Sequence, residues 1–195
     1  MRVWLMMASI TACLTLAACG LGEVAPSPKQ LDLGTSVVGK PATEQVEPIV
    51  LPNLAAASGL YERQVIWRMG PTGSPNSYAT YVWAAAPSVL VHERLFERLS
   101  LQGPVLPQDI NAEMAQLRVT LMQFEQIYAP DGTGNEAVVT LQAVLVKAGK
   151  VLGQRLVTER QAGRANTAPA GAEALRIATD KAVDQLVQWT IEQLN

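Results

Sequence analysis

Three successive strand patterns between Leu117 and Val157 constrain the fold more than any other feature of this sequence. Apolar side chains recur at every second position in the first two runs, which is the period of a strand with one buried face. Turn-forming residues separate the runs, at 131–135 (DGTGN) and at Ala148-Gly149. The apolar residues are Leu117, Val119 and Leu121 in the first run, Val139, Leu141, Ala143 and Leu145 in the second, and Leu152, Leu156 and Val157 in the third. We therefore predict three antiparallel neighbours in one sheet.

Two helices are predicted from apolar residues at helical spacing. Near the C-terminus, residues 170–194 carry Leu175, Ala178, Ala182, Leu186 and Trp189 on one face, and this face is expected to dock on the sheet. A second helix is predicted over 88–101, preceded by Pro87 in the first turn. Its apolar stripe includes Val91, Leu95 and Leu99 with His92 and Phe96, and the side chains expected to face water are Glu93, Arg94, Glu97 and Arg98.

The N-terminal half has shorter strand signals. Residues 30–34 and 46–51 are each predicted to form a strand. Residues 64–68 and 78–83 flank a turn-forming cluster at 70–76 and are predicted to form a hairpin. The whole pattern predicts an α+β fold: a single domain with a mixed, mostly antiparallel β-sheet and two main helices packed on it.

The first nineteen residues are typical of a secretory signal that ends at a lipidated cysteine. One charge at Arg2 precedes an uncharged stretch that is too short and too interrupted to span a bilayer. Residues 16–19 (LAAC) look like the lipobox of bacterial lipoproteins. We predict a signal peptide over 1–18, lipidation of Cys19, a flexible lipid-anchored tether over 19–29 and a domain over 30–195. The alternative is that Cys13 and Cys19 are ordinary cysteines of a soluble protein.

Anchoring by three acyl chains on Cys19 would be effectively permanent. The mature chain would then have no free thiol, so its stability in an oxidising compartment would depend on its core. It would carry fourteen basic and seventeen acidic residues, a formal charge of −3, which does not suggest nucleic acid as a partner. Gly20 follows the cysteine where lipoproteins of the inner membrane often carry aspartate, so by resemblance we expect the periplasmic face of the outer membrane.

The sequence offers no constellation for catalysis, for a metal or for a cofactor. His92 is the only histidine, and it lacks the partners that a catalytic base or a zinc site needs. The segment 131–135 lacks the spacing of a calcium loop and is predicted to be a turn. We therefore expect that the protein is not an enzyme. Tryptophan is usually a core or interface residue, so Tyr81 and Trp83 near the hairpin are either core or contacts to a partner or ligand.

Several of these features together resemble the ABC-type transport auxiliary lipoprotein family, the lipoprotein partners of MCE-type lipid transport systems, including the paraquat-inducible one. They are the lipobox, the LDLG segment at 31–34, Arg68 at the end of a strand, Tyr78 to Pro87 (Y-x4-W-x3-P), Phe124-Glu125, and the helix that ends near Trp189. The segment 83–87 (WAAAP), which leads directly into a helix, is the most specific of them. The resemblance extends from Leu31 to Trp189.

The resemblance implies a non-catalytic role in moving lipid or other apolar molecules across the envelope. The expected partners are an MCE-domain protein and its ABC transporter, with the membrane contacted through the lipid anchor. A homo-oligomer around a symmetric MCE assembly is a further expectation. The alternative hypothesis is a free periplasmic carrier that binds a lipid or another small molecule.

Overall fold

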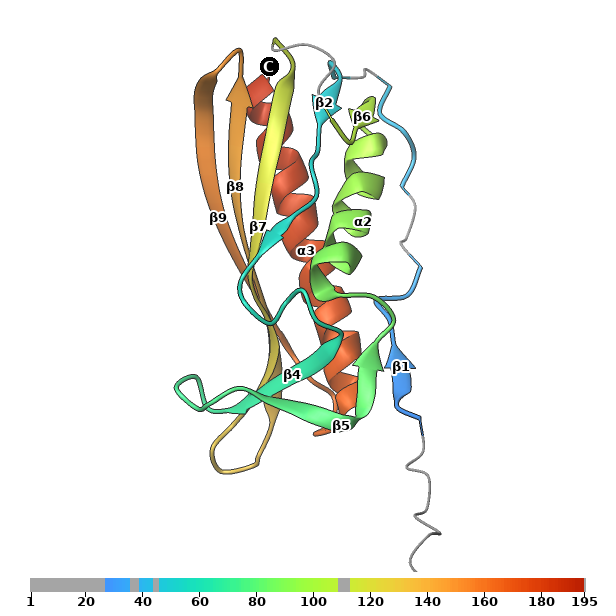
Figure 1. Cartoon of the computed structure of the whole chain (residues 1–195), viewed down its shortest axis with the longest axis vertical. Coiled ribbons are helices and arrows are strands. Elements are labelled where there is room, and N and C mark those ends of the chain that lie inside the picture. The colour runs from blue at the N-terminus through green and yellow to red at the C-terminus, as the bar shows by residue number, and fades with distance from the viewer. Residues whose placement is uncertain (1–26, 36–38, 44–45, 109–112, 195) are drawn as a thin grey trace, which may run out of the picture.

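The computed structural model describes residues 27–35, 39–43, 46–108 and 113–194. Within these residues a nine-stranded mixed sheet forms one layer. Two helices, α2 (Pro87–Ser100) and α3 (Ala168–Leu194), form a second layer on one face of the sheet (Figure 1). The predicted α+β class, with a mixed sheet and two helices packed on it, is confirmed.

Three long strands make up one half of the sheet: β7 (Ala115–Tyr128), β8 (Asn135–Lys147) and β9 (Lys150–Ala162). They are antiparallel neighbours, as predicted. The turn between β8 and β9 consists of Ala148 and Gly149, with φ angles of 50° and 72°. Positive φ at both central residues gives a turn whose twist matches that of the flanking strands. β8 and β9 pair along nearly their whole length, with one register shift between Leu145 and Val146 close to the turn.

The opposite edge of β7 pairs with short strands. They are β2 (Ile49–Val50), β3 (Ala55–Ala56) and β4 (Gln64–Met69), each parallel to β7 and each at a later position along it. The strand β6 (Val105–Leu106) pairs with β2. Two-residue strands leave no periodic pattern, so β3 and β6 were not predicted. The expected strand at 46–51 is only two residues long.

The predicted hairpin is confirmed. It consists of β4 and β5 (Asn76–Trp83), which are antiparallel. The first strand, β1 (Lys29–Leu31), pairs with β5 in parallel, with Leu31 opposite Trp83. It is shorter than the predicted strand at 30–34. Pairing with β5 places the start of the folded domain at the same end of the molecule as the hairpin (Figure 1).

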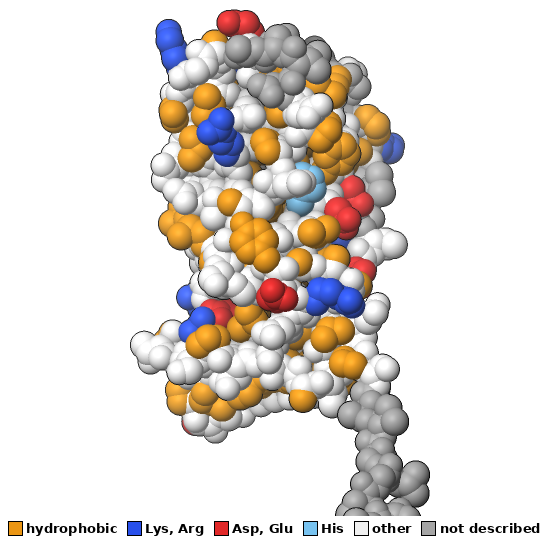
Figure 2. All heavy atoms as spheres, in the orientation of Figure 1, with side chains coloured by type: hydrophobic (Ala, Val, Ile, Leu, Met, Phe, Trp, Pro, Cys, Tyr) orange, Lys and Arg blue, Asp and Glu red, His pale blue; other side chains and the backbone are white. Residues whose placement is uncertain are grey.

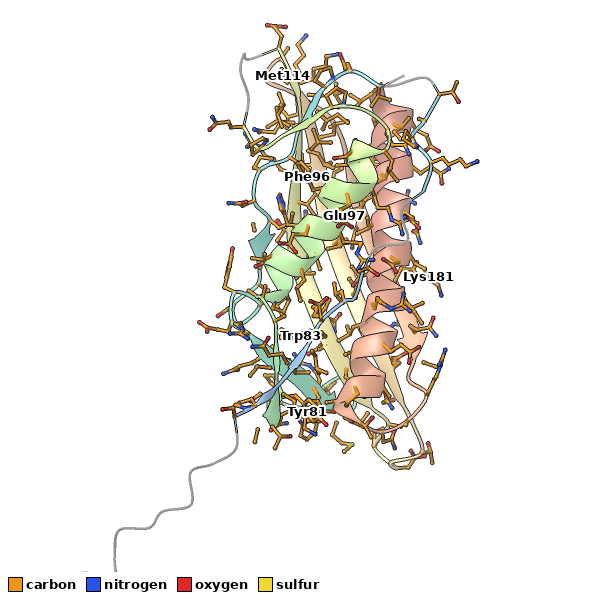
Figure 3. All side chains as sticks on the ribbon, turned by 90° about the vertical axis from the view of Figure 1, so that its right-hand side faces the viewer. Tyr81, Trp83, Phe96, Glu97, Met114 and Lys181 are labelled. Carbon is orange, nitrogen blue, oxygen red and sulfur yellow. The ribbon has the colours of Figure 1, made fainter. Side chains whose placement is uncertain are left out.

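The core lies between the two helices and the sheet. The predicted docking face of α3 is buried, from Leu175 at 1% exposed to Trp189 at 9%. On α2 the residues Val91, Leu95 and Leu99 are all 0% exposed. Phe96, which the apolar stripe was expected to include, is 38% exposed and points away from α3 (Figure 3).

Arg94 corrects the prediction that this side chain faces water. It is 4% exposed, and its guanidinium donates hydrogen bonds to Asp180 Oδ1 on α3 at 2.8 Å, to the Leu33 carbonyl at 3.0 Å and to the Gly34 carbonyl at 2.8 Å. A buried cation is tolerated only when it is paired and hydrogen-bonded, and these three acceptors meet that requirement. Arg94 thus joins α2, α3 and the segment that follows β1.

The N-terminal end of α3 approaches β7 closely at Gly171. A Cβ at this position would lie 2.3 Å from Gln126 Oε1. The Gln126 amide is held on both sides, because its Oε1 accepts a hydrogen bond from the Tyr78 hydroxyl at 2.8 Å and its Nε2 donates one to Asn135 Oδ1 at 2.7 Å. The glycine therefore makes room for a hydrogen-bonded glutamine that is only 1% exposed.

We expect the substitution Gly171→Ala to lower the free energy of unfolding by about 1–3 kcal/mol, the usual effect of overpacking a filled interior. The added methyl group would push the Gln126 amide away from its partners. Denaturant titration followed by circular dichroism measures the effect. The control is Gly134→Ala, where a Cβ meets no heavy atom within 4 Å, and its effect should stay within about 0.5 kcal/mol. Equal effects of the two substitutions would contradict the close approach.

The predicted signal peptide and Cys19 lie outside the described residues, as does the tether up to residue 26. In the part of the chain that the structure describes, no helix has both the length and the apolar character that a bilayer crossing requires.

Candidate functional site

The candidate site is a groove of about 610 Å³ where the β4–β5 hairpin meets β7. Its walls are the loop 57–60, the start of β5 with the residue before it, alternate residues of β4, and the middle of β7. Figure 2 shows a band of acidic and basic side chains across the drawn face, just above the hairpin. The lining residues are Ala57, Ser58, Gly59, Leu60, Gln64, Ile66, Arg68, Pro75, Asn76, Ser77, Met122, Gln123, Phe124 and Glu125.

An ion pair forms the charged part of this lining. Arg68 Nε lies 2.6 Å from Glu125 Oε2, and the exposed fractions of the two side chains are 27% and 5%. The other carboxylate oxygen of Glu125 accepts a hydrogen bond from Gln123 Nε2 at 2.6 Å, and Arg68 Nη1 donates one to the Gly73 carbonyl at 2.9 Å. Both oxygens of the nearly buried carboxylate are thus occupied, as its desolvation requires.

A β-bulge in β7 shapes the floor of the groove. The register with β8 shifts between Leu121 and Gln123, so Met122 is the extra residue. A bulge bends its strand and redirects the side chains beside it. Leu121 and Phe124, three residues apart instead of two, are therefore both buried, while Met122 between them is 47% exposed.

The groups that line the groove can form hydrogen bonds to a bound molecule. The described lining holds one acid and one base, Glu125 and Arg68, and they are bonded to each other. Nucleophilic catalysis needs a nucleophile in contact with a base, and neither Ser58 nor Ser77 has such a partner among the described residues. Among those residues no three His, Cys, Asp or Glu side chains come close enough together to hold a metal ion. The groove offers amide, hydroxyl and guanidinium groups for hydrogen bonds.

Trp83 and Tyr81, which the sequence left as either core residues or contacts to a partner or ligand, are not among the residues that line this groove. Trp83 is 0% exposed and packs edge-on against Phe124, with 5.3 Å between the ring centroids. Of the two alternatives, core and contact, the structure places Trp83 in the core, where no partner reaches it. Tyr81 is half-buried and is paired with Lys29, at the end of the molecule where β1 begins (Figure 3).

Tyr81 belongs to a group of aromatic side chains with Trp67, Tyr78 and Tyr128. The rings of Tyr78 and Tyr81 meet edge-on at 6.2 Å, and Trp67 meets Tyr128 edge-on at 5.7 Å. The Tyr78 and Tyr128 hydroxyls are hydrogen-bonded to each other. Burial, and secondly this hydrogen bond, raise the pKa of Tyr78 well above its usual value. The ring contacts and the hydroxyl hydrogen bond make the group a packed cluster.

The other residues singled out in the sequence have structural surroundings. His92 is half-buried on α2, and burial lowers the pKa of its imidazole, partly opposed by the nearby charge of Glu93. Asp131 lies in the turn between β7 and β8, where hydrogen bonds from the Thr133 backbone and then from its hydroxyl lower the pKa of the carboxyl. This confirms the turn predicted for 131–135.

Arg68 and Glu125 are both features of the family resemblance, but the sequence did not predict that they form an ion pair. One signal was available. Glu125 and Gln126 stand between the apolar residues Phe124 and Ile127, and a buried carboxylate requires a cation or several donors. Which cation it meets could not be inferred, because Arg68 lies 57 residues earlier in the chain.

We expect Arg68→Met to lower the free energy of unfolding by about 1–3 kcal/mol, because it leaves the Glu125 carboxylate in a nearly buried place without its cation. Chemical denaturation of the variant measures this loss. Adding Glu125→Gln should restore part of the stability, since the neutral amide costs less to bury. A double variant less stable than Arg68→Met alone would argue against this account.

The comparisons with known proteins concern the fold. No family model matches the sequence, and no curated protein sequence matches it. A crystal structure of a Xanthomonas campestris protein described as a member of family DUF330 matches with a TM-score of 0.71 and 17% identity, over 86% of this chain and 96% of that one. The structure of an uncharacterised protein matches at 0.66 and 13%, over 85% and 99%.

A third similar structure is that of a hypothetical protein from Chlamydia trachomatis, with a TM-score of 0.51 and 6% identity, over 78% of this chain and 98% of that one. Identities this low show likeness of fold and nothing about activity. The chain spans nearly the whole length of each of the three proteins. It therefore has the same fold as the Xanthomonas campestris protein of family DUF330.

Proposed function

We propose that this protein is a lipid-anchored periplasmic subunit of an MCE-type transport system that moves lipid or other apolar molecules. It is attached to the membrane through Cys19 and acts by docking rather than by catalysis. The proposal rests first on the sequence, namely the lipobox at 16–19 and the ordered set of features that resemble the auxiliary lipoprotein family. The expected partners are an MCE-domain protein and its ABC transporter.

One structural observation carries the docking role. Two features of the family pattern, Arg68 and Glu125, meet as an ion pair at a groove that opens to solvent. A charge pair that is satisfied within the protein leaves a groove with hydrogen-bonding groups and no reactive group. Such a surface suits recognition of another protein, where polar contacts fix orientation.

The lining of the groove supports docking over carriage of lipid. An acyl chain is best held by a largely apolar cavity. Arg68, Glu125, Gln64, Gln123 and Asn76 all line this groove. The described core beneath it is filled by large side chains such as Trp83, Phe124 and Leu121. No observation on the described residues favours the carrier hypothesis.

The proposed anchor would place one end of the domain toward the membrane. Ten residues lead from Cys19 to Lys29, where β1 begins, and a fully extended chain of that length spans at most about 35 Å. The hairpin lies at the same end of the molecule as β1 (Figure 1). On this proposal, a partner would meet the groove close to the membrane surface.

Affinity purification of the lipidated protein from its native envelope, after chemical crosslinking, tests the proposal. We expect mass spectrometry to show enrichment of an MCE-domain protein and its ABC transporter. The substitution Cys19→Ala is the control, because it removes the anchor and should reduce this enrichment. A preparation that carries lipid but no MCE-domain protein would overturn the docking role and favour the carrier.

A further inference from the structure

The strand pairing of β7 has a gap at the groove. On this edge of β7, β3 pairs with Thr120 and Leu121, and β4 pairs with residues from Gln126 to Tyr128. Among the described residues, the stretch Met122–Glu125 has no strand partner on this side. The same four residues line the groove. An unpaired strand edge thus forms its floor.

The main-chain groups of Phe124 point into this gap. The Tyr128 carbonyl accepts a hydrogen bond from the Gly70 N–H at 2.8 Å, so Tyr128 presents its main chain to the β4 side. Alternate residues of a strand present their N–H and C=O groups to the same side, which places those of Gln126 and Phe124 there too. Gln126 is paired with β4. Phe124 is among the residues that line the groove, although the residue as a whole is only 2% exposed.

Arg68 adds a charged donor at one end of the gap. Its Nε and Nη1 are bonded to Glu125 and Gly73. The printed contacts among the described residues leave Nη2 without an acceptor, and the side chain is 27% exposed. Because both oxygens of Glu125 are already occupied, the groove has an excess of donors at this end. Charge complementarity favours a carboxylate on the occupant.

We propose that the groove binds a short extended peptide segment of a partner protein, which hydrogen-bonds to the Phe124 main chain and places an acidic side chain against Arg68. Four residues of β7 correspond to about 13 Å of strand, so the gap accommodates a segment of about four residues. Addition of a strand to an open sheet edge is a recurrent mode of peptide recognition, with side-chain pockets for specificity. Met122 and Ile66 supply the apolar contacts.

This inference deepens the proposed docking role and rests on it. Its test uses the full lipidated chain with the photocrosslinker p-benzoylphenylalanine at Ser77, in the groove, or at Glu97, an exposed position of α2 (Figure 3). Irradiation of envelopes followed by mass spectrometry identifies the crosslinked partner segment. We expect the Ser77 position to crosslink the MCE-domain partner at one short segment that contains Asp or Glu, and the Glu97 position to yield at least tenfold less of that product.

A synthetic peptide of the crosslinked segment then tests the binding mode. Two peptides are compared, one N-methylated at the odd-numbered amides and the other at the even-numbered amides. One of them should bind at least tenfold more weakly than the unmodified peptide, and the other should bind equally well. Replacing the acidic residue by its amide should also weaken binding at least tenfold. If the two N-methylated peptides bind with equal affinity, the proposed main-chain pairing is wrong. If the partner co-purifies but crosslinks only at Glu97, the inference fails while the docking role stands. If no MCE-domain protein co-purifies, the docking role itself fails.

Discussion

Replacing Arg94 by methionine is expected to lower the free energy of unfolding by about 3–5 kcal/mol, the cost typical of removing one partner from a buried ion pair. Arg94 is 4% exposed and is bonded at once to Asp180 and to the carbonyls of Leu33 and Gly34. Among the described residues, the variant would leave the Asp180 carboxylate, whose side chain is 17% exposed, with Arg176 at 3.3 Å as its remaining cation. Guanidinium denaturation followed by circular dichroism measures the loss.

The matched control is Arg164→Met, which removes an arginine that is also paired with an acid on α3. Arg164 lies 3.2 Å from Glu173, but its side chain is 77% exposed. Exposed pairs contribute little, so this variant should match the parent protein closely. If the two variants are equally stable, the buried role of Arg94 is wrong. The double variant Arg94→Met with Asp180→Leu should recover part of the loss, because no carboxylate remains buried there.

Trp83→Ala is expected to lower the free energy of unfolding by about 3–5 kcal/mol, through lost burial and the cavity that remains. Trp83 is 0% exposed, and its ring packs against Phe124 at the centre of the core. Thermal and chemical denaturation both report this change. A loss of partner binding without a loss of stability would instead indicate that Trp83 is a contact residue.

Leu156→Ala on β9 provides the comparison for this experiment. Leu156 is 59% exposed, so its truncation should change the free energy of unfolding by no more than about 0.5 kcal/mol. The contrast separates a large apolar residue in the core from one at the surface. A substantially lower free energy of unfolding for Leu156→Ala would mean that the exposed face of the sheet is covered in solution.

The elements with local periodicity could be predicted from the sequence. The helix α3 follows from the spacing of Leu175, Ala178 and Ala182, and the meander β7–β9 follows from alternation and turn signals. Each of these patterns reflects one face buried over many residues. The two-residue strands β3 and β6 have no such pattern, because their position is set by neighbours distant in sequence.

Arg94 shows where sequence reasoning went wrong. It lies three residues after Val91 and directly before Leu95, so the helical period alone would place it beside the buried stripe. Its charge led to the opposite prediction. A charged side chain is usually solvated, and the burial of Arg94 is favourable because the fold brings Asp180 and the carbonyls of Leu33 and Gly34, all distant in the chain, within hydrogen-bonding distance.

The sequence by itself determined the fold class, the helices, the meander and the hairpin, since these depend on local periodicity and turn chemistry. Only the tertiary structure decided that Trp83 is buried, that Arg68 meets Glu125, and that the middle of β7 lies open at a groove. The physical reason is the separation along the chain of the residues that interact. Periodicity acts over a few residues, whereas an ion pair or a gap between strands depends on which distant segments the fold brings together.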